Sequence, residues 1–347
     1  MAVVRERRLP QLTLTLDLPG GNRTCLPLPP SIPTAPTAVA TTTSEQHRIT
    51  DFEKLEVLGH GNGGTVYKAR HRRTSALYAL KLIQVADLTA RRQATREVEI
   101  LRSAADHPSI IRCHGVVSLA SGDIAVLLDL MDAGSLESLL RRRGGAPLPE
   151  PALAEIARQA LLGLSHLHAH QIAHRDIKPS NLLINAAGEI KIADFGVSKI
   201  VRRSLDPCVS YVGTCAYMSP ERFDPVEHGG GYDGYAGDVW GLGLTLMEMG
   251  TGRFPLVPEG ERANWAGLMW AICFGEPPTI PESSEASPEL RDFVARCLER
   301  EAGERWTVAQ LLGHPFVAGA DAAESKRALT ELLRFDSVTT DSRDSGS

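Results

Sequence analysis

The spacing of apolar positions changes along the chain and divides it into two differently patterned parts. From residue 52 to residue 83, short β-branched and apolar runs are interrupted by glycines, a pattern typical of antiparallel strands. From residue 91 to residue 102, Val98 and Leu101 are spaced as on one face of a helix. The pattern therefore predicts a small lobe, residues 51–130, made of an antiparallel sheet and one helix.

Beyond Gly134, apolar residues recur every three and four positions, which predicts a larger and mainly helical lobe over residues 131–317. Helices are expected at 135–143, 151–170, 238–251 and 288–299. Together the two parts predict an α+β fold with two lobes. Past Phe316 the chain becomes polar, so we expect the tail, residues 318–347, to fray, with at most a turn or two of helix at 328–333.

Composition and charge are those of an ordinary globular protein. The 347 residues are 43% hydrophobic and 23% charged, and the formal net charge of -5 favours neither nucleic-acid nor membrane partners. The six cysteines show no C-x-x-C spacing, so neither a zinc site nor a disulfide framework is predicted. With no long apolar run and no secretory signal, we expect the protein in the cytoplasm or the nucleus.

Two short motifs carry the chemistry. Residues 174–181 read His-Arg-Asp-Ile-Lys-Pro-Ser-Asn, and Asp-Phe-Gly follows at 194–196. In sites that transfer phosphoryl groups, these motifs supply a base for the substrate hydroxyl and ligands for magnesium. We therefore expect Asp176 to be the catalytic base and both Asn181 and Asp194 to hold Mg²⁺.

Two neighbours of Asp176 have different expected roles. Lys178, two residues further on, can place a positive charge on the transferring phosphate. His174 is better interpreted as a packed structural histidine, because Asp176 already fills the role of base.

A glycine-rich run at 59–66, Gly-His-Gly-Asn-Gly-Gly-Thr-Val, lies between two strand-like segments. Glycines without Cβ atoms let backbone amides approach phosphates closely. A dinucleotide-binding fold would need a helix opening at the glycines, whereas residues 66–69 continue as a strand. By itself the run is equally compatible with an ordinary glycine-rich hairpin.

Lys81 follows an apolar strand, where its ammonium group can bind the α and β phosphates. Alone, it would be interpreted as a surface lysine. Glu97 on the predicted helix is its expected counterion, and Glu99 is the alternative. The two glutamates are about 200° apart around a helix, so Glu99 faces solvent if Glu97 faces inward.

The wording of three segments identifies a family resemblance. "HRDIKPSNLLIN" at 174–185, "KIADFGVSKI" at 191–200 and "YVGTCAYMSPER" at 211–222 together resemble MAP kinase kinases of the plant type, which are dual-specificity protein kinases. The resemblance covers residues 51–317 and implies the bilobal kinase fold, ATP and Mg²⁺. It also implies a MAP kinase substrate phosphorylated on Thr and Tyr, an upstream kinase that activates this one, and a monomer.

The resemblance further implies where the nucleotide binds. The adenine is expected at the hinge near Asp129 and Met131, with Leu128 behind it and Leu183 below. The whole set expected to contact the nucleotide is Leu58, Gly59, His60, Gly61, Asn62, Gly63, Gly64, Val66, Ala79, Lys81, Leu128, Asp129, Met131 and Leu183.

The segment 213–221 resembles the peptide-positioning loop of protein kinases, which argues against kinases of small molecules. In it, Ser219 replaces the Ala of the usual A-P-E motif, a change small enough to leave the role of Glu221 intact. Residues 238–243 resemble the start of the buried central kinase helix, and Arg305 is expected to form an ion pair with Glu221.

Regulation is expected in the loop before that segment. Ser204 and Ser210 are separated by five residues, as in the plant-type activation motif, so we predict that an upstream kinase phosphorylates both. Phosphates there can pair with basic residues such as Arg175. Ordinary loop serines are the alternative interpretation.

Residues 1–48 are rich in Pro, Thr and Ala without a sustained period, which predicts a disordered arm. Within it, residues 5–14 place a basic cluster before Leu12 and Leu14, which resembles a MAP kinase docking site. A solvated tail and an organellar transit peptide are the alternatives.

Two other functions compete with a MAP kinase kinase. One is a pseudokinase-like scaffold that binds MAP kinases, and the other is a different serine/threonine kinase. The intact Lys81, Asp176, Asn181 and Asp194 count against the scaffold, and the paired serines count against the other kinase.

Overall fold

The computed structural model describes residues 49–61, 64–104, 106–196, 199–200, 215–223, 232–257, 260 and 264–344, with only the backbone at 199–200 and 335–344. These residues belong to one compact unit that spans Gln46–Ser347. The predicted arm, Asn62, Gly63, Ser204 and Ser210 lie outside the described residues. Among the residues described, no helix is both long and apolar enough to cross a membrane.

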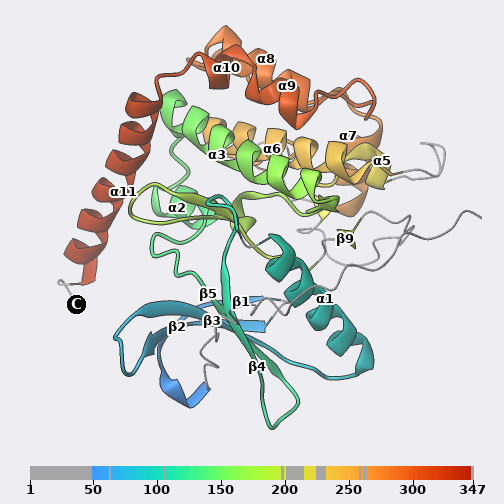
Figure 1. The fold of residues 1–347 in the computed structure, drawn as a ribbon. Coiled ribbons are helices and arrows are strands. Elements are labelled where there is room, and N and C mark those ends of the chain that lie inside the picture. The colour runs from blue at the N-terminus through green and yellow to red at the C-terminus, as the bar shows by residue number, and fades with distance from the viewer. Residues whose placement is uncertain are drawn as a thin grey trace, which may run out of the picture. The chain divides into compact units, whose positions relative to one another are not determined.

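The small lobe is the predicted antiparallel sheet with one long helix (Figure 1). Its strand order is β1-β2-β3-β5-β4, and a short helical turn, Ile49–Asp51, precedes it. Alternate residues of β5 point to opposite faces, because Ala125 and Leu127 pack with Phe52 while Val126 packs on the side of α1. The elements are β1 (Phe52–Gly61), β2 (Gly64–His71), β3 (Leu77–Ile83), α1 (Leu88–Ala104), β4 (Cys113–Ser118) and β5 (Ile124–Leu128).

The large lobe is mainly helical, as predicted (Figure 1). Its helices are α2 (Leu136–Arg142), α3 (Glu150–Ala169), α5 (Pro220–Phe223), α6 (Gly234–Thr251), α7 (Trp265–Cys273), α8 (Pro288–Cys297), α9 (Val308–Leu312), α10 (Pro315–Ala318) and α11 (Ala322–Asp344). Two short antiparallel pairs lie beside them: β6 (Ile172–Ala173) with β9 (Lys199–Ile200), and β7 (Leu182–Ile184) with β8 (Ile190–Ile192).

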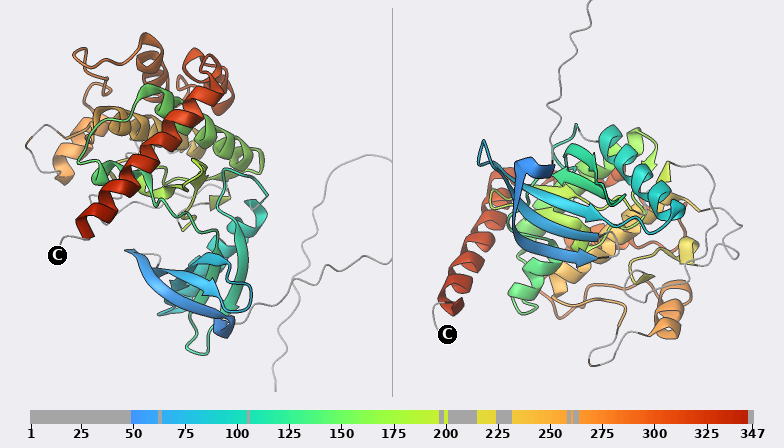
Figure 2. Two further views of the ribbon diagram at one scale, coloured as in Figure 1. Left: turned by 90° about the vertical axis from the view of Figure 1, so that its left-hand side faces the viewer. Right: turned by 90° about the horizontal axis from the view of Figure 1, so that it is seen from below.

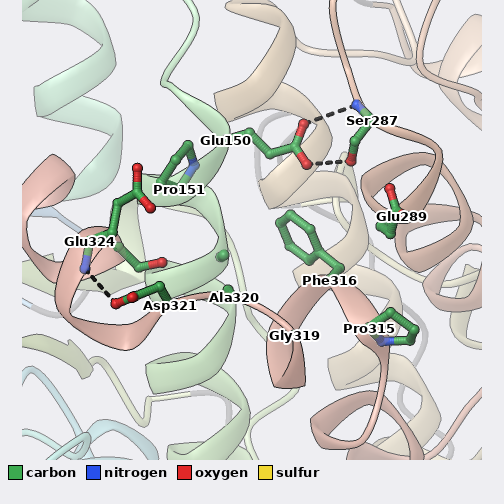
Figure 3. A pocket seen from close by; sticks show the side chains of 12 residues that line it. Glu150, Pro151, Ser287, Glu289, Pro315, Phe316, Gly319, Ala320, Asp321 and Glu324 are labelled. Atoms are coloured by element: carbon green, nitrogen blue, oxygen red, sulfur yellow. Dashed lines mark hydrogen bonds between the residues drawn. The ribbon is translucent and has the colours of Figure 1, made fainter.

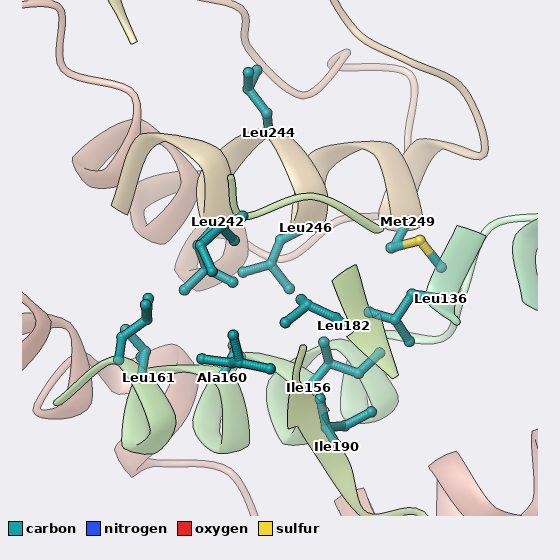
Figure 4. Close-up of a cluster of buried hydrophobic side chains, with 14 of the residues drawn as sticks. Leu136, Ile156, Ala160, Leu161, Leu182, Ile190, Leu242, Leu244, Leu246 and Met249 are labelled. Atoms are coloured by element: carbon teal, nitrogen blue, oxygen red, sulfur yellow. The ribbon is translucent and has the colours of Figure 1, made fainter. Parts of the chain in front are cut away.

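The core of the large lobe forms where α3 and α6 face each other (Figure 4). Helix α6 begins at Asp233, whose carboxylate accepts hydrogen bonds from the first-turn amides of Tyr235 and Ala236. It ends at Gly252, where φ is 79° and an added Cβ would lie 1.9 Å from the Gly145 carbonyl oxygen. The labelled core side chains include Ile156, Ala160, Leu161, Leu182, Ile190, Leu242, Leu246 and Met249.

The expectation of a frayed tail is wrong. Residues 322–344 form the continuous helix α11, which lies along the outside of the large lobe and packs on α3 (Figure 2). Leu329, Leu332 and Leu333 are buried in this contact, and Asp321 caps the first turn. Helix α11 has few apolar residues, so the composition of this segment does not predict a helix, although those few residues lie on one face.

An open pocket of about 340 Å³ lies where α3, α8, α10 and α11 begin or meet (Figure 3). Glu150 accepts hydrogen bonds from the backbone and the hydroxyl of Ser287 at its edge, and Phe316 contributes apolar surface. None of the residues predicted from the sequence to bind nucleotide or catalyse transfer lines this pocket.

The predicted ion pair between Glu221 and Arg305 is confirmed. The two Arg305 guanidinium nitrogens lie 2.9 Å and 3.2 Å from the Glu221 carboxylate oxygens. The side chains of Arg305 and Glu221 are 0% and 3% exposed. Arg305 also donates to the carbonyl oxygens of Ala236, Glu299 and Arg300, so the pair joins α5, α6 and the end of α8.

We expect Arg305→Ala to lower the free energy of unfolding by about 3 to 5 kcal/mol, because it leaves the Glu221 carboxylate buried without its counterion. Urea denaturation followed by tryptophan fluorescence measures this loss. Arg327→Ala is the control, because the Arg327 side chain is 68% exposed and its Nε atom is as far as 4.0 Å from Glu331 Oε1. An equal, small effect of both substitutions would contradict the role of the buried pair.

Candidate active site

Lys81 lies between two carboxylates that come from different parts of the fold. Its ammonium nitrogen is 2.7 Å from Glu97 Oε1 on α1 and 3.2 Å from Asp194 Oδ1, just after β8. The side chains of Lys81 and Glu97 are 9% and 6% exposed, whereas Glu99 faces solvent. The predicted pairing of Lys81 with Glu97 rather than Glu99 is therefore confirmed.

Burial and charge act in opposite directions on Lys81. Desolvation alone would lower the pKa of its ammonium group, but the attraction of Asp194 and Glu97 and the hydrogen bonds to both outweigh burial and raise it. Lys81 therefore stays protonated at neutral pH. A permanent cation at this position suits the binding of phosphate oxygens.

The expected catalytic residues of the 174–181 motif converge on Asp176. The Lys178 ammonium nitrogen is 2.8 Å from Asp176 Oδ2. Asn181 Nδ2 donates to the same oxygen at 2.9 Å and to the Asp176 backbone carbonyl at 2.7 Å. The Asp176 carboxylate is thus held in one orientation by a cation and an amide, which is the preorganisation that a general base needs.

A second set of contacts connects this motif to Asp194. The backbone amide of Ala193 donates to the Asn181 carbonyl at 2.9 Å, and His174 Nε2 lies 3.1 Å from the Ala193 carbonyl. His174 is fully buried and meets the buried Phe195 ring edge-on at 5.1 Å, so its predicted structural role is confirmed. Asp194 itself has a φ of 65°, a conformation that its surroundings must impose.

Asp238, at the start of α6, holds the backbone of the catalytic loop. Its carboxylate is 1% exposed and accepts hydrogen bonds from the amide of His174 at 2.8 Å and the amide of Arg175 at 2.6 Å. The His168 ring nitrogen lies 3.0 Å from the same carboxylate. Arg175 has a φ of 71°, so these bonds maintain a conformation that is unfavourable for a non-glycine residue.

The motif at 238–243 predicts that Asp238 lies in a buried helix, but not that it contacts the loop. A signal was present, because Asp238 is a charged residue at the start of an otherwise apolar run. Gly241, one turn further along, is needed for the same approach. A Cβ added there would lie 2.5 Å from the Ile177 carbonyl oxygen of the loop.

The residues expected around the nucleotide lie on the strands of the small lobe, on the connection between the lobes and on β7 of the large lobe. Leu58, Gly59, His60 and Gly61 are on β1, and Gly64 and Val66 are on β2. Gly64 has a φ of 112°, and an added Cβ would lie 1.9 Å from the Leu82 carbonyl oxygen, so only glycine fits. Ala79 on β3 is the direct partner of Leu128 on β5, and Met131 is buried beyond them. Leu183 is on β7.

The oxygen donors of Asn181 and Asp194 fit a hard divalent cation. Within the described ranges, no group of three or more His, Cys, Asp or Glu side chains is arranged to hold a metal. Magnesium commonly binds through one or two protein carboxylates together with substrate phosphates. The donor set therefore fits a metal that arrives with a nucleotide, and 47% of the Asp194 side chain is exposed to receive it.

A five-stranded lobe with a Lys81–Glu97 pair, joined to a helical lobe that carries a fixed Asp176, defines a protein kinase. The family model "Protein kinase domain" matches residues 52–317. Protein kinases use ATP and a divalent metal ion. All the described catalytic side chains are in place, so the structure offers no support for the scaffold alternative.

Similar proteins define the family more narrowly. Mitogen-activated protein kinase kinase 9 of Arabidopsis thaliana is 52% identical over 323 residues, which covers 91% of this chain and 99% of the relative. Kinase kinase 7 of the same plant is 49% identical over 322 residues with the same shares. Kinase kinase 1c of Physcomitrium patens is 40% identical and covers 85% of each chain. The chain belongs to the plant mitogen-activated protein kinase kinases.

We expect Asp238→Asn to lower both stability and phosphate transfer. The substituted side chain can accept a hydrogen bond from one backbone amide of the loop, but it presents its NH₂ group to the other. Hydrogen bonds to a charged group contribute about 1.5 to 3 kcal/mol each. A displaced loop should slow transfer by about 100-fold. Urea denaturation and a phosphate-transfer assay measure the two effects.

Asp233→Asn on the same helix is the matched control, because Asn caps a helix about as well as Asp. It should leave both quantities nearly unchanged. If Asp238→Asn behaved like this control, the carboxylate would not be what holds the loop.

Proposed function

We propose that this protein transfers the γ-phosphate of ATP, bound with Mg²⁺, to Thr and Tyr hydroxyls in the activation loop of a MAP kinase. The observation that carries the proposal is the fixed Asp176 carboxylate, 2.8 Å from Lys178 and 2.9 Å from Asn181. The names of the similar plant proteins, each a mitogen-activated protein kinase kinase, support the choice of substrate. The protein then acts in a MAP kinase cascade.

The proposed reaction assigns a role to each side chain. The acceptor hydroxyl oxygen forms the new bond to the γ-phosphorus, its proton passes to Asp176, and the bond between that phosphorus and the bridging oxygen of ADP breaks. Lys178 offsets negative charge on the transferring group, and Lys81 binds the α and β phosphates. Asn181 and Asp194 would hold Mg²⁺, which supplies charge neutralisation on the phosphates.

Regulation by phosphorylation of Ser204 and Ser210 is part of the proposal. An upstream kinase would add the phosphates, each bringing about -1.5 to -2 charges. The Arg175 guanidinium carbon lies 5.0 Å from the centroid of the Tyr232 ring, which places a cation beside the segment that follows this loop. Arg222 contacts the Arg175 carbonyl, which brings a second cation to the same place.

We further propose that residues 5–14 bind the MAP kinase. The arginines of this segment would meet an acidic patch, while Leu12 and Leu14 would enter apolar pockets. The proposal also includes a monomer, the state that the family resemblance implies, located in the cytoplasm or the nucleus.

The test is transfer of labelled phosphate from Mg-ATP to catalytically inactive plant MAP kinases. We expect phosphate on both Thr and Tyr of the activation loop, greater transfer when Ser204 and Ser210 are both replaced by Glu, and none with Asp176→Ala. Ser204→Ala with Ser210→Ala should prevent activation by an upstream kinase. Phosphate on serine or threonine only would favour another kinase class, and normal activation of the Ala variant would exclude these sites.

Deleting residues 1–16 should weaken MAP kinase binding and leave nucleotide binding unchanged, because the segment lies outside the kinase domain. Calorimetry with the MAP kinase and with Mg-ADP separates the two quantities. Deleting residues 26–41 removes the same length of the arm and is the control. An equal loss of MAP kinase affinity in both deletions would contradict a specific docking role.

A further inference from the structure

The side chain of Asp129 joins three segments at the connection between the lobes. Its Oδ1 lies 2.7 Å from Nε2 of His114 on β4, and its Oδ2 lies 2.6 Å from the ammonium nitrogen of Lys191 on β8. The amide of Arg112 donates to Oδ2 at 3.3 Å, and the Asp129 amide donates back to the Arg112 carbonyl at 3.1 Å. We call His114, Asp129 and Lys191 the hinge network.

An irregularity in the sheet aims His114 at Asp129. The register between β4 and β5 shifts between Cys113 and Gly115, so His114 is the extra residue of a bulge. Bulges change the direction in which a side chain points. The ring of Tyr78 on β3 meets the His114 ring edge-on at 5.2 Å and limits its movement. The small lobe thus presents His114 in a fixed position.

Lys191 contributes the large-lobe side of the network. It lies three residues before Asp194 and is the strand partner of Leu183, the residue expected below the adenine. The next residue, Ile192, exchanges backbone hydrogen bonds with Ser109 and Ile111 at 2.8 Å and 3.0 Å. Strand β8 therefore connects the expected floor of the adenine site with the segment that leads from α1 to β4.

The contacts of the network are partly shielded from solvent. The side chains of His114, Asp129 and Lys191 are 27%, 21% and 16% exposed. Desolvation would raise the pKa of Asp129, but hydrogen bonds from His114 and Lys191 lower it to about 2. The carboxylate is consequently ionised throughout the physiological range, and its pair with Lys191 is less screened than a surface pair.

We propose that the hinge network positions the nucleotide, by fixing the backbone at Asp129–Met131 relative to the strand that leads to Asp194. The adenine end and the metal end of ATP are then held by one connected unit. This inference rests on the proposed placement of the adenine at the hinge. His114 and Lys191 are positioning residues, since they act through Asp129 and β8 and not on the reacting atoms.

The hinge network and the Lys81–Glu97 pair are formed together in this structure, so the network is compatible with an assembled site. Within the described part of the chain, its three side chains form no hydrogen bond or ion pair with Asp176, Lys178 or Asn181. Loosening it should weaken nucleotide binding more than it slows the chemical step.

The experiment compares Lys191→Met, which keeps the length of the side chain but removes its charge, with Lys191→Arg and with wild type. We expect Lys191→Met to raise both the Kd for Mg-ADP, measured by calorimetry, and the KM for ATP by about tenfold, with kcat within about twofold. Lys191→Arg should stay near wild type. Lys68→Met removes a charge whose partner is the exposed Glu56, and it should change neither constant.

Two further measurements separate positioning from general stabilisation. Asp129→Asn combined with Lys191→Met should raise Kd by no more than the larger single effect, because both variants break the same contact. Hydrogen exchange at the amides of Leu130 and Met131 should accelerate in Lys191→Met and not in Lys68→Met.

A lower melting temperature with unchanged Kd and KM would overturn the inference, as would a fall in kcat at constant KM. The proposed function can fail separately. If wild type phosphorylated no MAP kinase while Lys191→Met still raised the Kd for Mg-ADP, the hinge network would stand and the proposed substrate would not.

Discussion

The catalytic apparatus depends on one buried carboxylate. The Asp238 carboxylate accepts hydrogen bonds from the backbone amides of His174 and Arg175, and Arg175 has an unfavourable left-handed conformation. The loop keeps this conformation because α6 supplies the acceptor. The remaining contacts follow in sequence. Asn181 holds the backbone immediately before Asp194, and Asp194 contacts Lys81. Through these contacts, α6 helps to fix the position of Asp194, one of the two carboxylates that contact Lys81 of the small lobe.

Negatively charged side chains outnumber positively charged ones in the site. Asp176, Asp194 and Glu97 contribute three carboxylates, against two ammonium groups from Lys81 and Lys178. A nucleotide with several negative charges is therefore repelled by the side chains considered together. A divalent cation held by Asn181 and Asp194 would supply the positive charge that this site lacks, so the metal and the nucleotide would bind together.

Local patterns were sufficient for much of the fold and for the central contacts. Strand and helix periods predicted both lobes, and helical geometry showed that only one of Glu97 and Glu99 could face inward; the structure shows that it is Glu97. Helix α11 was missed because its apolar face is narrow and becomes recognisable only once α3 covers it. The contact of His114 with Asp129 depends on a bulge, and no single residue type predicts a bulge. The predicted phosphorylation sites and docking segment remain predictions.

The Glu221–Arg305 pair limits which substitutions the large lobe of this protein can accept. Either residue replaced alone leaves a charge enclosed in the lobe, and replacing Arg305 also removes the donor of the carbonyl groups around it. An apolar substitute can be tolerated only if both positions change together and the space is filled. The two positions, 84 residues apart in the chain, can therefore be exchanged for apolar residues only as a unit.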